Sequence, residues 1–396
     1  MMQISPEIQL FIREHSSDDV RVLALQAKKY PDIDMPTVIT QIAGRKVAAE
    51  KIPSWWEIEK IWYPKHLSLE QCSSEITARY KARLLQGDSL TDLTGGFGID
   101  CSFLATGFKS ATYVERQEEL CEIAAHNFPV LNLNHINIKN EDGVTYLQAM
   151  SPVDCLFLDP ARRNEHGGKT VAISDCEPNV AELEELLLQK ANRVMIKLSP
   201  MLDLSLALKE LKQTQEVHIL SVNNECKELL ILLGQTSPAE ISIHCVNLFT
   251  KGTQKEQHFV FTREQEQCSE CTYTDSLETY LYEPNASLLK AGAFRSIAAA
   301  YPVRKLHPNS HLYTSDTFIE NFPGRIFRIV NQCSFNKKEV KENLADLKKA
   351  NVTVRNFPAT VAELRKRIHL AEGGDTYLFA STLNNGQKVI IRCEKV

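Results

Sequence analysis

The stretch DLTGGFGID, residues 92–100, joins a strand-terminal acid to three closely spaced glycines. A turn that leaves a buried strand must let its backbone approach a ligand, and glycine removes the side chains that would prevent this. We therefore predict that this loop binds a nucleotide-like cofactor and that the chain is an enzyme. The residues predicted to bind the cofactor here are Asp92, Thr94, Gly95, Gly96, Phe97 and Gly98.

Two common glycine-rich motifs do not match the chain. The dinucleotide fingerprint G-x-G-x-x-G/A requires a glycine or alanine three positions after Gly98, where the chain has Cys101. A phosphate-binding G-x-x-x-x-G-K-[ST] loop would need glycine at position 163, which is Arg163. The sequence therefore disfavours a nicotinamide-dependent oxidoreductase and excludes a P-loop ATPase.

Further acids follow at the ends of other expected strands. ATYVER ends a second strand at Glu115, where a cofactor ribose would offer its hydroxyls. NEDGVTYL places Asp142 at the start of a helix after a third strand, and the apolar run VDCLFL stops at Asp159 and Pro160. Strand and helix patterns alternate over residues 90–233, which predicts parallel βαβ units whose carboxyl ends meet at one edge.

In this order and spacing, residues 75–235 resemble the class I S-adenosylmethionine-dependent methyltransferases. The resemblance implies a Rossmann-like, doubly wound α/β core with S-adenosylmethionine as its cofactor. It makes residues 92–98 the first cofactor motif, Glu115 the ribose acid and Asp142 the acid beside the adenine. Over its whole length the chain is similar to a bacterial group of such enzymes with a C-terminal THUMP-like domain, a module associated with RNA binding.

The same resemblance makes Asp159 and Pro160 the catalytic, substrate-side motif. Related aminomethyltransferases have a [DNS]-P-P-aromatic motif here, whose first residue accepts hydrogen bonds from the exocyclic amine of a base. In this chain Ala161 and Arg162 replace the second proline and the aromatic residue. Because an arginine can stack on a base or hold a phosphate, we expect Arg162 or Arg163 to bind the substrate.

Lys197, in KLSP, ends another strand at the same edge. It is predicted to bind the substrate, unless it only belongs to a strand-terminating turn.

The cysteines bear on which atom of the substrate is methylated. Carbon methylation of a pyrimidine would require a nucleophilic cysteine beside the base, and the first cysteine after Asp159 is Cys176. We therefore predict methylation of a base nitrogen of ribosomal or transfer RNA. The alternatives are a small-molecule or protein methyltransferase, and a non-catalytic RNA-binding protein that retains the cofactor site.

The chain divides into four predicted domains. In residues 1–80, apolar residues recur at helical steps between prolines, which predicts a helical N-terminal domain. Residues 81–235 form the methyltransferase core. Residues 236–323 are predicted to form a β extension and a helical connector, with a ferredoxin-like fold as one alternative. Residues 324–396 alternate strand and helix patterns and are predicted to form a small α+β domain, which the resemblance makes THUMP-like.

Composition narrows the class of protein. Of the 396 residues, 43% are hydrophobic and 24% charged, as in ordinary globular proteins. The sequence has no apolar run of about 18 residues and no signal-peptide pattern, so we expect a cytoplasmic protein without membrane contact. Its 11 cysteines are scattered, which favours reduced thiols. Only Cys268 and Cys271 have metal-like spacing, and since no second pair lies nearby, no metal is predicted.

Charge is uneven along the chain. Residues 324–396 contain 14 Lys and Arg against 7 Asp and Glu, a balance of +7 within a chain of net charge −5. The remaining residues therefore carry −12. This asymmetry fits a C-terminal domain that binds RNA phosphates, and a solvated charged face is the alternative. The sequence leaves the oligomeric state open.

Overall fold

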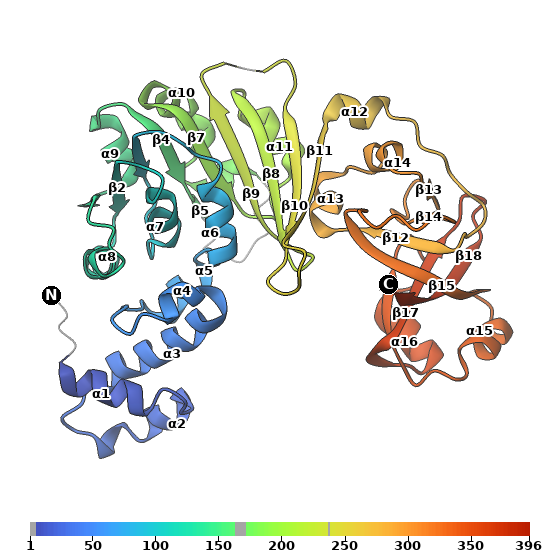
Figure 1. Cartoon of the computed structure of the whole chain (residues 1–396), viewed down its shortest axis with the longest axis horizontal. Coiled ribbons are helices and arrows are strands. Elements are labelled where there is room, and N and C mark those ends of the chain that lie inside the picture. The colour runs from blue at the N-terminus through green and yellow to red at the C-terminus, as the bar shows by residue number, and fades with distance from the viewer. Residues whose placement is uncertain (1–4, 163–171, 237) are drawn as a thin grey trace. The chain divides into compact units, whose positions relative to one another are not determined.

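The computed structural model describes residues 5–162, 172–236 and 238–396 (Figure 1). The chain divides into two compact units. The first consists of Met1–Gln215 with Leu230–Pro238, and the second of Glu216–Leu229 with Ala239–Val396. The strand β9 (Glu225–Gly234) begins in the second unit and ends in the first. The four-domain division drawn from the sequence stays a prediction.

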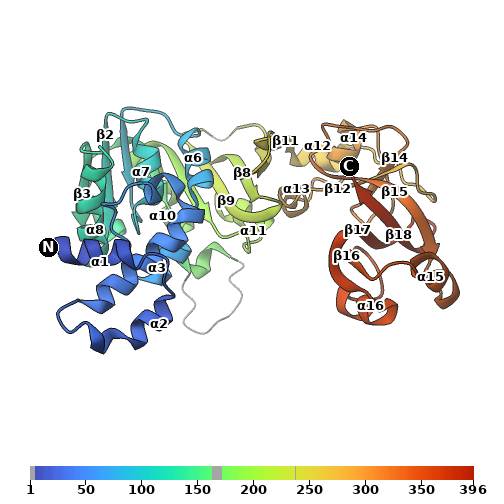
Figure 2. The ribbon, with the colours of Figure 1, turned by 60° about the horizontal axis from the view of Figure 1, so that its bottom comes forward.

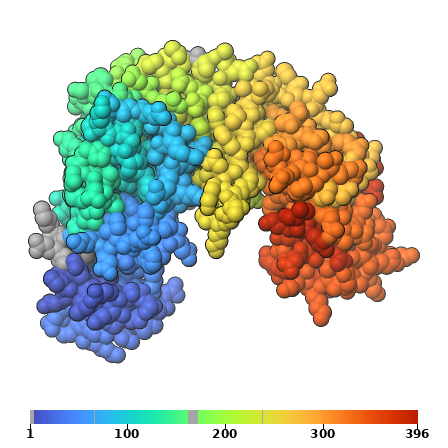
Figure 3. All heavy atoms as spheres, in the orientation of Figure 1, coloured from blue at the N-terminus to red at the C-terminus, as the bar shows by residue number. Residues whose placement is uncertain are grey.

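Short helices open the first unit, as the apolar periodicity predicts. At the start of α3, Asp34 Oδ1 accepts a hydrogen bond from the Thr37 amide, and Pro36 occupies the first turn, where its missing N–H costs nothing. The first three helices share a small apolar core and form the blue part of the space-filling view (Figure 3). The α-helices of this region are α1 (Pro6–Glu14), α2 (Val20–Leu25), α3 (Met35–Lys51), α4 (Pro53–Trp56), α5 (His66–Gln71) and α6 (Glu75–Ala82).

Five parallel strands form the sheet of the first unit, in the order β7-β4-β1-β2-β3, and the end of β9 lies next to β7. The strands are β1 (Ser89–Asp92), β2 (Ser110–Glu115), β3 (Ile136–Asn140), β4 (Val153–Leu158) and β7 (Ala191–Leu198). The helices are α7 (Ile99–Ala105), α8 (Glu118–Val130), α9 (Gly143–Ala149), α10 (Val180–Lys190) and α11 (Leu204–Glu210). After β1 the chain adds β2 and β3 on one side of it. It then crosses back and adds β4 and β7 on the other side. Ligands bind at such a switch point, outside the carboxyl ends of the strands.

The second unit begins with an antiparallel hairpin. β8 (Thr214–Val222) turns into β9 through Asn223 and Asn224, whose φ angles are +50° and +68°. Two successive left-handed residues form the turn that matches the twist of a tight hairpin, and asparagine adopts them more readily than most residues. β10 (Ser242–Leu248) pairs in parallel with β8 and antiparallel with β11 (Glu256–Thr262). β10 and β11 thus lie in the segment 236–323, for which a β extension is expected.

The rest of the second unit is built on a seven-stranded sheet, in the order β13-β14-β12-β15-β18-β17-β16. Its faces bury different residues: Phe379 of β17 joins one apolar core, whereas its neighbours Leu378 and Ala380 join the other. The second core also contains Leu344 of α15 and Leu364 of α16, so both helices cover that face (Figures 1 and 2). The strands are β12 (Tyr280–Pro284), β13 (Arg304–Lys305), β14 (Tyr313–Ser315), β15 (Gly324–Ser334), β16 (Lys349–Val354), β17 (Ala371–Thr382) and β18 (Lys388–Lys395). The helices are α12 (Arg263–Cys268), α13 (Ala286–Ala291), α14 (Ser296–Ala300), α15 (Lys337–Leu344) and α16 (Val361–Ile368).

The α/β class expected from the sequence is confirmed by this architecture: a helical N-terminal region, a doubly wound parallel sheet and a small α+β C-terminal region. Within the described residues, no helix is both long enough and apolar enough to cross a membrane.

Candidate functional site

The glycine loop between β1 and α7 takes a course that only small residues allow. A Cβ on Gly95 would lie 2.2 Å from Cε2 of Tyr113, so a larger residue would collide with that ring. Gly96 and Gly98 have φ angles of +55° and +86°, in the left-handed region that glycine adopts without strain. The Tyr113 hydroxyl donates to the Gly96 carbonyl, and the Gly95 amide donates to the Val114 carbonyl at 2.8 Å. The second strand thus fixes the shape of the loop.

Glu115 ends β2 directly beside this loop. Its Oε2 accepts a hydrogen bond from the Gly96 amide at 2.9 Å, and its Oε1 accepts one from the Gln117 amide at 2.8 Å. The residue is buried, but an ionised carboxylate has about four acceptor positions, so both oxygens can still accept hydroxyl donors. Two predicted parts of the cofactor site therefore lie side by side.

Asp92 is buried at the end of β1, with 1% of its surface exposed. Its Oδ1 accepts a hydrogen bond from the Thr94 amide at 3.0 Å, whereas Oδ2 has no hydrogen-bond partner among the described residues. Burial raises the pKa of the Asp92 carboxyl to about 8, since the hydrogen bond from Thr94 offsets the desolvation only in part. The unpartnered Oδ2 is a polar atom that a ligand or water would stabilise.

Asp159 follows β4 at the same edge of the sheet. Its amide donates to Thr94 Oγ1 at 2.6 Å, which joins the end of β4 to the glycine loop. Its Oδ2 lies 2.5 Å from Nζ of Lys197, at the end of β7. Desolvation raises the pKa of the Asp159 carboxyl, while the Lys197 ammonium and the 36% exposure of the Asp159 side chain favour its ionised form. Pro160 is buried directly after it.

A buried charge network supports this pair. Lys197 Nζ also lies 3.2 Å from Oδ2 of Asp100 in α7, and Lys81 Nζ of α6 lies 2.9 Å from Asp100 Oδ1. The Ser73 hydroxyl accepts hydrogen bonds from both ammonium groups, at 2.7 and 3.0 Å, and donates to Asp100 Oδ2 at 2.7 Å. Burial acts to raise the pKa of Asp100, but the two lysines outweigh it and hold that pKa well below its usual range. Two helices and a strand are thereby held around Lys197.

Two other predicted cofactor residues have structural partners. Asp142 caps α9, because its Oδ1 accepts hydrogen bonds from the amides of Val144 and Thr145, both at 3.0 Å. It lies at the end of β3, next to the strand that carries Glu115. The ring of Phe97 is buried against Trp55, with ring centroids 5.2 Å apart. Its side chain therefore anchors the loop in the core, and only its main chain can line the site.

The predicted substrate-binding residues are only partly described. Arg162 lies in the short strand β5 (Ala161–Arg162), opposite Cys176 of β6 (Cys176–Glu177). Arg163 lies outside the described residues, whereas Lys197 lies beside Asp159, as the strand-end argument predicts.

Sequence reasoning missed three members of the charge network, Ser73, Lys81 and Asp100. Ser73 and Lys81 lie beside or in an ordinary helix with no motif around them, whereas Asp100 ends the glycine-rich stretch 92–100. The one available signal was at Asp100, an acid that is followed by the apolar segment CSFLA.

Comparison with known proteins agrees with this fold. The chain and a "putative methyltransferase" from Porphyromonas gingivalis W83 share 35% identity over 98% of each chain, with a TM-score of 0.87. Residues 280–323 match the family model of a ferredoxin-like domain, and residues 324–395 match that of a THUMP domain-like family. The comparison with curated proteins gave no match.

Two more distant structures each cover 40% of this chain. One is a methyltransferase from Streptococcus mutans, described as putative and in complex with SAH. It shares 13% identity with this chain, the match covers 40% of this chain and 96% of that chain, and the TM-score is 0.30. The other is an rRNA methylase from Streptococcus thermophilus, with 14% identity, coverage of 40% and 93%, and a TM-score of 0.29.

The doubly wound sheet and the strand-edge loop define a class I methyltransferase core. The chain belongs to the methyltransferase family with a C-terminal THUMP-like domain that includes the Porphyromonas gingivalis protein.

Proposed function

We propose that this protein is an S-adenosylmethionine-dependent methyltransferase that modifies a base nitrogen of ribosomal or transfer RNA. One observation carries the proposal: the unpartnered, buried Asp92 Oδ2 and the glycine loop lie at the same sheet edge as Asp159, to which Thr94 joins them. Ligand-binding groups and a partly exposed acid thus occupy the switch point of the sheet.

The chain's own groups fit this cofactor. Glu115 can accept hydrogen bonds from ribose hydroxyls, because both of its oxygens keep acceptor capacity. Asp142 Oδ2 accepts no hydrogen bond from the described residues and can accept one from an adenine amino group. The absence of side chains at Gly95 and Gly96 lets the backbone approach the ligand closely. When bound, the cofactor would supply an electrophilic methyl group for in-line displacement.

The substrate side needs few catalytic groups, since displacement of this kind depends mainly on alignment of the nucleophile. Lys197 holds Asp159 Oδ2, and Oδ1 accepts no hydrogen bond from the described residues. Asp159 Oδ1 can therefore accept a hydrogen bond from the exocyclic amine of a base and orient its nitrogen. The Lys197 ammonium favours the ionised carboxylate, which is the form that accepts such a bond.

The basic C-terminal domain supports RNA as the substrate. Several of its arginines are already paired: Arg325 and Arg355 both contact the buried Glu283, and Arg392 pairs with Asp346. Most of its exposed cations instead lie on α15 and α16 or between them in the sequence, and both helices cover one face of the sheet. These are Lys337, Lys338, Lys341, Lys348, Lys349, Lys366 and Arg367, whereas Lys395 ends β18 and Arg328 pairs with Glu394. Such a surface can neutralise several phosphates.

Calorimetry with S-adenosylmethionine and its demethylated product tests the cofactor. Glu115→Gln should weaken binding at least about tenfold, because it replaces a charged acceptor by a neutral one. Glu118→Gln, an exposed residue at the start of α8, should leave affinity unchanged. Absence of binding to the unaltered protein would refute the proposal.

Transfer of a labelled methyl group to RNA from a strain that lacks this protein tests the reaction. We expect label in RNA with the unaltered protein, and a loss of at least about a hundredfold with Asp159→Asn at nearly unchanged cofactor affinity. Label in protein or small molecules alone would favour a different substrate. Cofactor and RNA binding without transfer would favour the non-catalytic alternative.

A further inference from the structure

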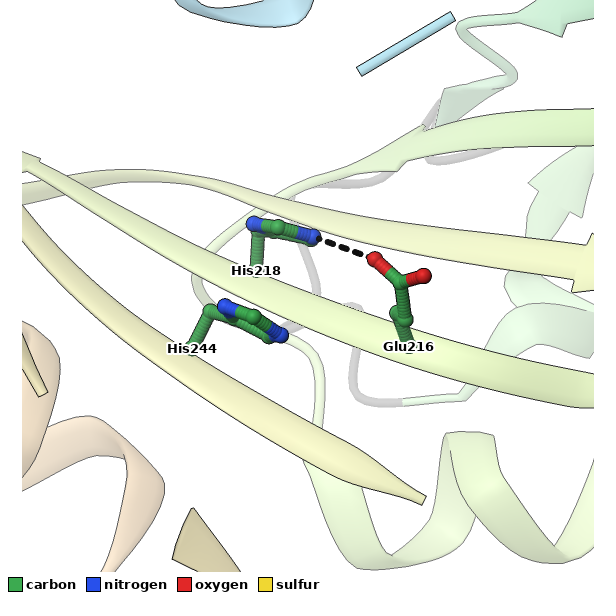
Figure 4. A group of neighbouring side chains, drawn as sticks. All are labelled: Glu216, His218 and His244. Carbon is green, nitrogen blue, oxygen red and sulfur yellow. Dashed lines mark hydrogen bonds and ion pairs between the residues drawn. The ribbon is translucent and has the colours of Figure 1, made fainter. Parts of the chain in front are cut away.

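Two histidines and a glutamate meet on one face of the strand pair formed by β8 and β10. His218 of β8 and His244 of β10 are directly opposed in the parallel strand pair, so their side chains lie on the same face. Glu216 precedes His218 by two residues and therefore points to this face as well (Figure 4). One donor atom from each of the three residues lies within 4.8 Å of the other two.

The hydrogen bonds of His244 leave one of its nitrogens as an acceptor. Ser242 Oγ lies 3.1 Å from His244 Nε2, and His258 Nε2, from β11, lies 3.1 Å from His244 Nδ1. If Nδ1 carries the proton and donates to His258, Nε2 presents a lone pair toward Ser242, whose hydroxyl can donate to it. A histidine that binds a metal uses its second nitrogen in this way, as a donor to a neighbouring acceptor.

Burial and charge favour a cation at this place. His218 is 3% exposed, and its Nε2 lies 3.2 Å from Glu216 Oε2. His244 is half-buried beside it. Neutral imidazoles and a carboxylate are the protonation states in which these groups bind zinc.

We propose that Glu216, His218 and His244 bind a divalent transition metal of the zinc type, with His258 positioning His244. Two imidazoles and one carboxylate are a known zinc ligand set that leaves a position for water. Metal–ligand bonds of about 2.0–2.1 Å place tetrahedral ligands about 3.3 Å apart. Glu216 and His218 already have this spacing.

The two imidazole rings need one adjustment. They are stacked, with centroids 4.3 Å apart and planes at 15°, so their lone pairs do not converge. A rotation of the His244 ring about its side-chain bonds turns Nε2 from Ser242 toward Glu216, and His244 is the less buried of the two. The bound metal would tie β8 to β10. This site is independent of the proposed methyl transfer, since no residue of the strand-edge site belongs to it.

Cobalt and zinc titrations of the full-length protein test the proposal, after chelator treatment and with the thiols kept reduced. We expect one Zn²⁺ per chain with submicromolar affinity, a rise in melting temperature on binding, and visible d–d absorption on Co²⁺ binding without a thiolate charge-transfer band. His244→Gln and Glu216→Gln should each weaken binding at least about tenfold. His369→Asn is the matched control, because His369 is an exposed histidine outside the cluster, with a φ of +55° that asparagine tolerates.

Each result decides the proposal. Loss of binding in both cluster variants with retention in the control supports it, provided that the metal-free variants melt within a few degrees of the unaltered protein. Variants that unfold are replaced by Ser242→Ala, which removes the competing hydroxyl and should preserve or strengthen binding. The proposal is overturned by no binding, by equal affinity in all variants, or by a thiolate band, which would assign the metal to cysteines.

Discussion

Lys197 Nζ lies 2.5 Å from Asp159 Oδ2, and the two residues end adjacent parallel strands at the switch point of the sheet. The same ammonium lies 3.2 Å from the buried Asp100 carboxylate. Lys197 therefore connects the one partly exposed acid of the substrate side to a charge network that is almost completely buried.

Replacement of Lys197 should change the pH dependence of transfer. Without the adjacent ammonium, the pKa of Asp159 rises further, so the ionised form is lost at a higher pH. For Lys197→Met we expect at least a tenfold lower kcat/KM at pH 7 and an acidic limb of the pH profile shifted upward. Lys197→Arg should restore part of the activity because it keeps the charge. An unshifted profile in the methionine variant would contradict this positioning role.

Gly95 should not tolerate even a methyl group. Its Cβ would lie 2.2 Å from the Tyr113 ring, which is fully buried and cannot move away. Gly95→Ala should lower the free energy of unfolding by about 1–3 kcal/mol, measured by urea denaturation. Gly107→Ala is the matched control, since its nearest neighbour would be a carbonyl oxygen at 3.8 Å. Equal stability of the two variants would count against the described loop.

Removal of Lys81 should be much more costly than removal of an exposed lysine. Lys81 is fully buried against Asp100, and its loss leaves that carboxylate with less compensating charge. Lys81→Met should reduce the free energy of unfolding by about 3–5 kcal/mol. Lys109→Met breaks the exposed pair with Asp88 and should leave stability nearly unchanged. Chemical denaturation measures the free energy of unfolding of both variants. Equal losses in Lys81→Met and Lys109→Met would disprove the prediction.

The buried Asp92 should make the first unit less stable as pH rises. Its folded-state pKa of about 8 lies above the ordinary 3.8, so the folded protein binds more protons than the unfolded chain between these values. The free energy of unfolding should therefore fall from about pH 4 to pH 8. Asp92→Asn cannot titrate and should remove a decline on the order of 5 kcal/mol. Parallel stability profiles of variant and unaltered protein would exclude the raised pKa.

The lysines of α15 should contribute to RNA affinity through phosphate contacts. For the triple change Lys337→Ala, Lys338→Ala and Lys341→Ala, the slope of log affinity against log salt should decrease by about 2, as expected for three contacts to single-stranded RNA. Lys28→Ala with Lys29→Ala, at exposed positions of the N-terminal helices, is the control. Filter binding over a range of salt concentrations measures both. A slope that does not change would remove α15 from the RNA-binding surface.

The sequence predicted the strands of the core well, because each is a short apolar run that ends abruptly in a polar residue. Asp92, Glu115 and Asp159 all follow such runs, and parallel pairing brings their ends to one edge. The helices of residues 324–396 were predictable for a similar reason: KKEVKENL and TVAELRKRI show apolar residues at helical spacing.

The remaining relationships depend on pairing between distant segments. The sequence does not pair Lys81 with Asp100, since a lysine and an aspartate on separate helices reveal a buried ion pair only when those helices pack. His218 and His244 are likewise ordinary strand residues until parallel pairing of β8 with β10 makes them direct neighbours. Local sequence determined which residues end strands, because burial and turn chemistry act over a few residues. Tertiary structure alone decided which charged groups meet, because that depends on strand order and helix packing.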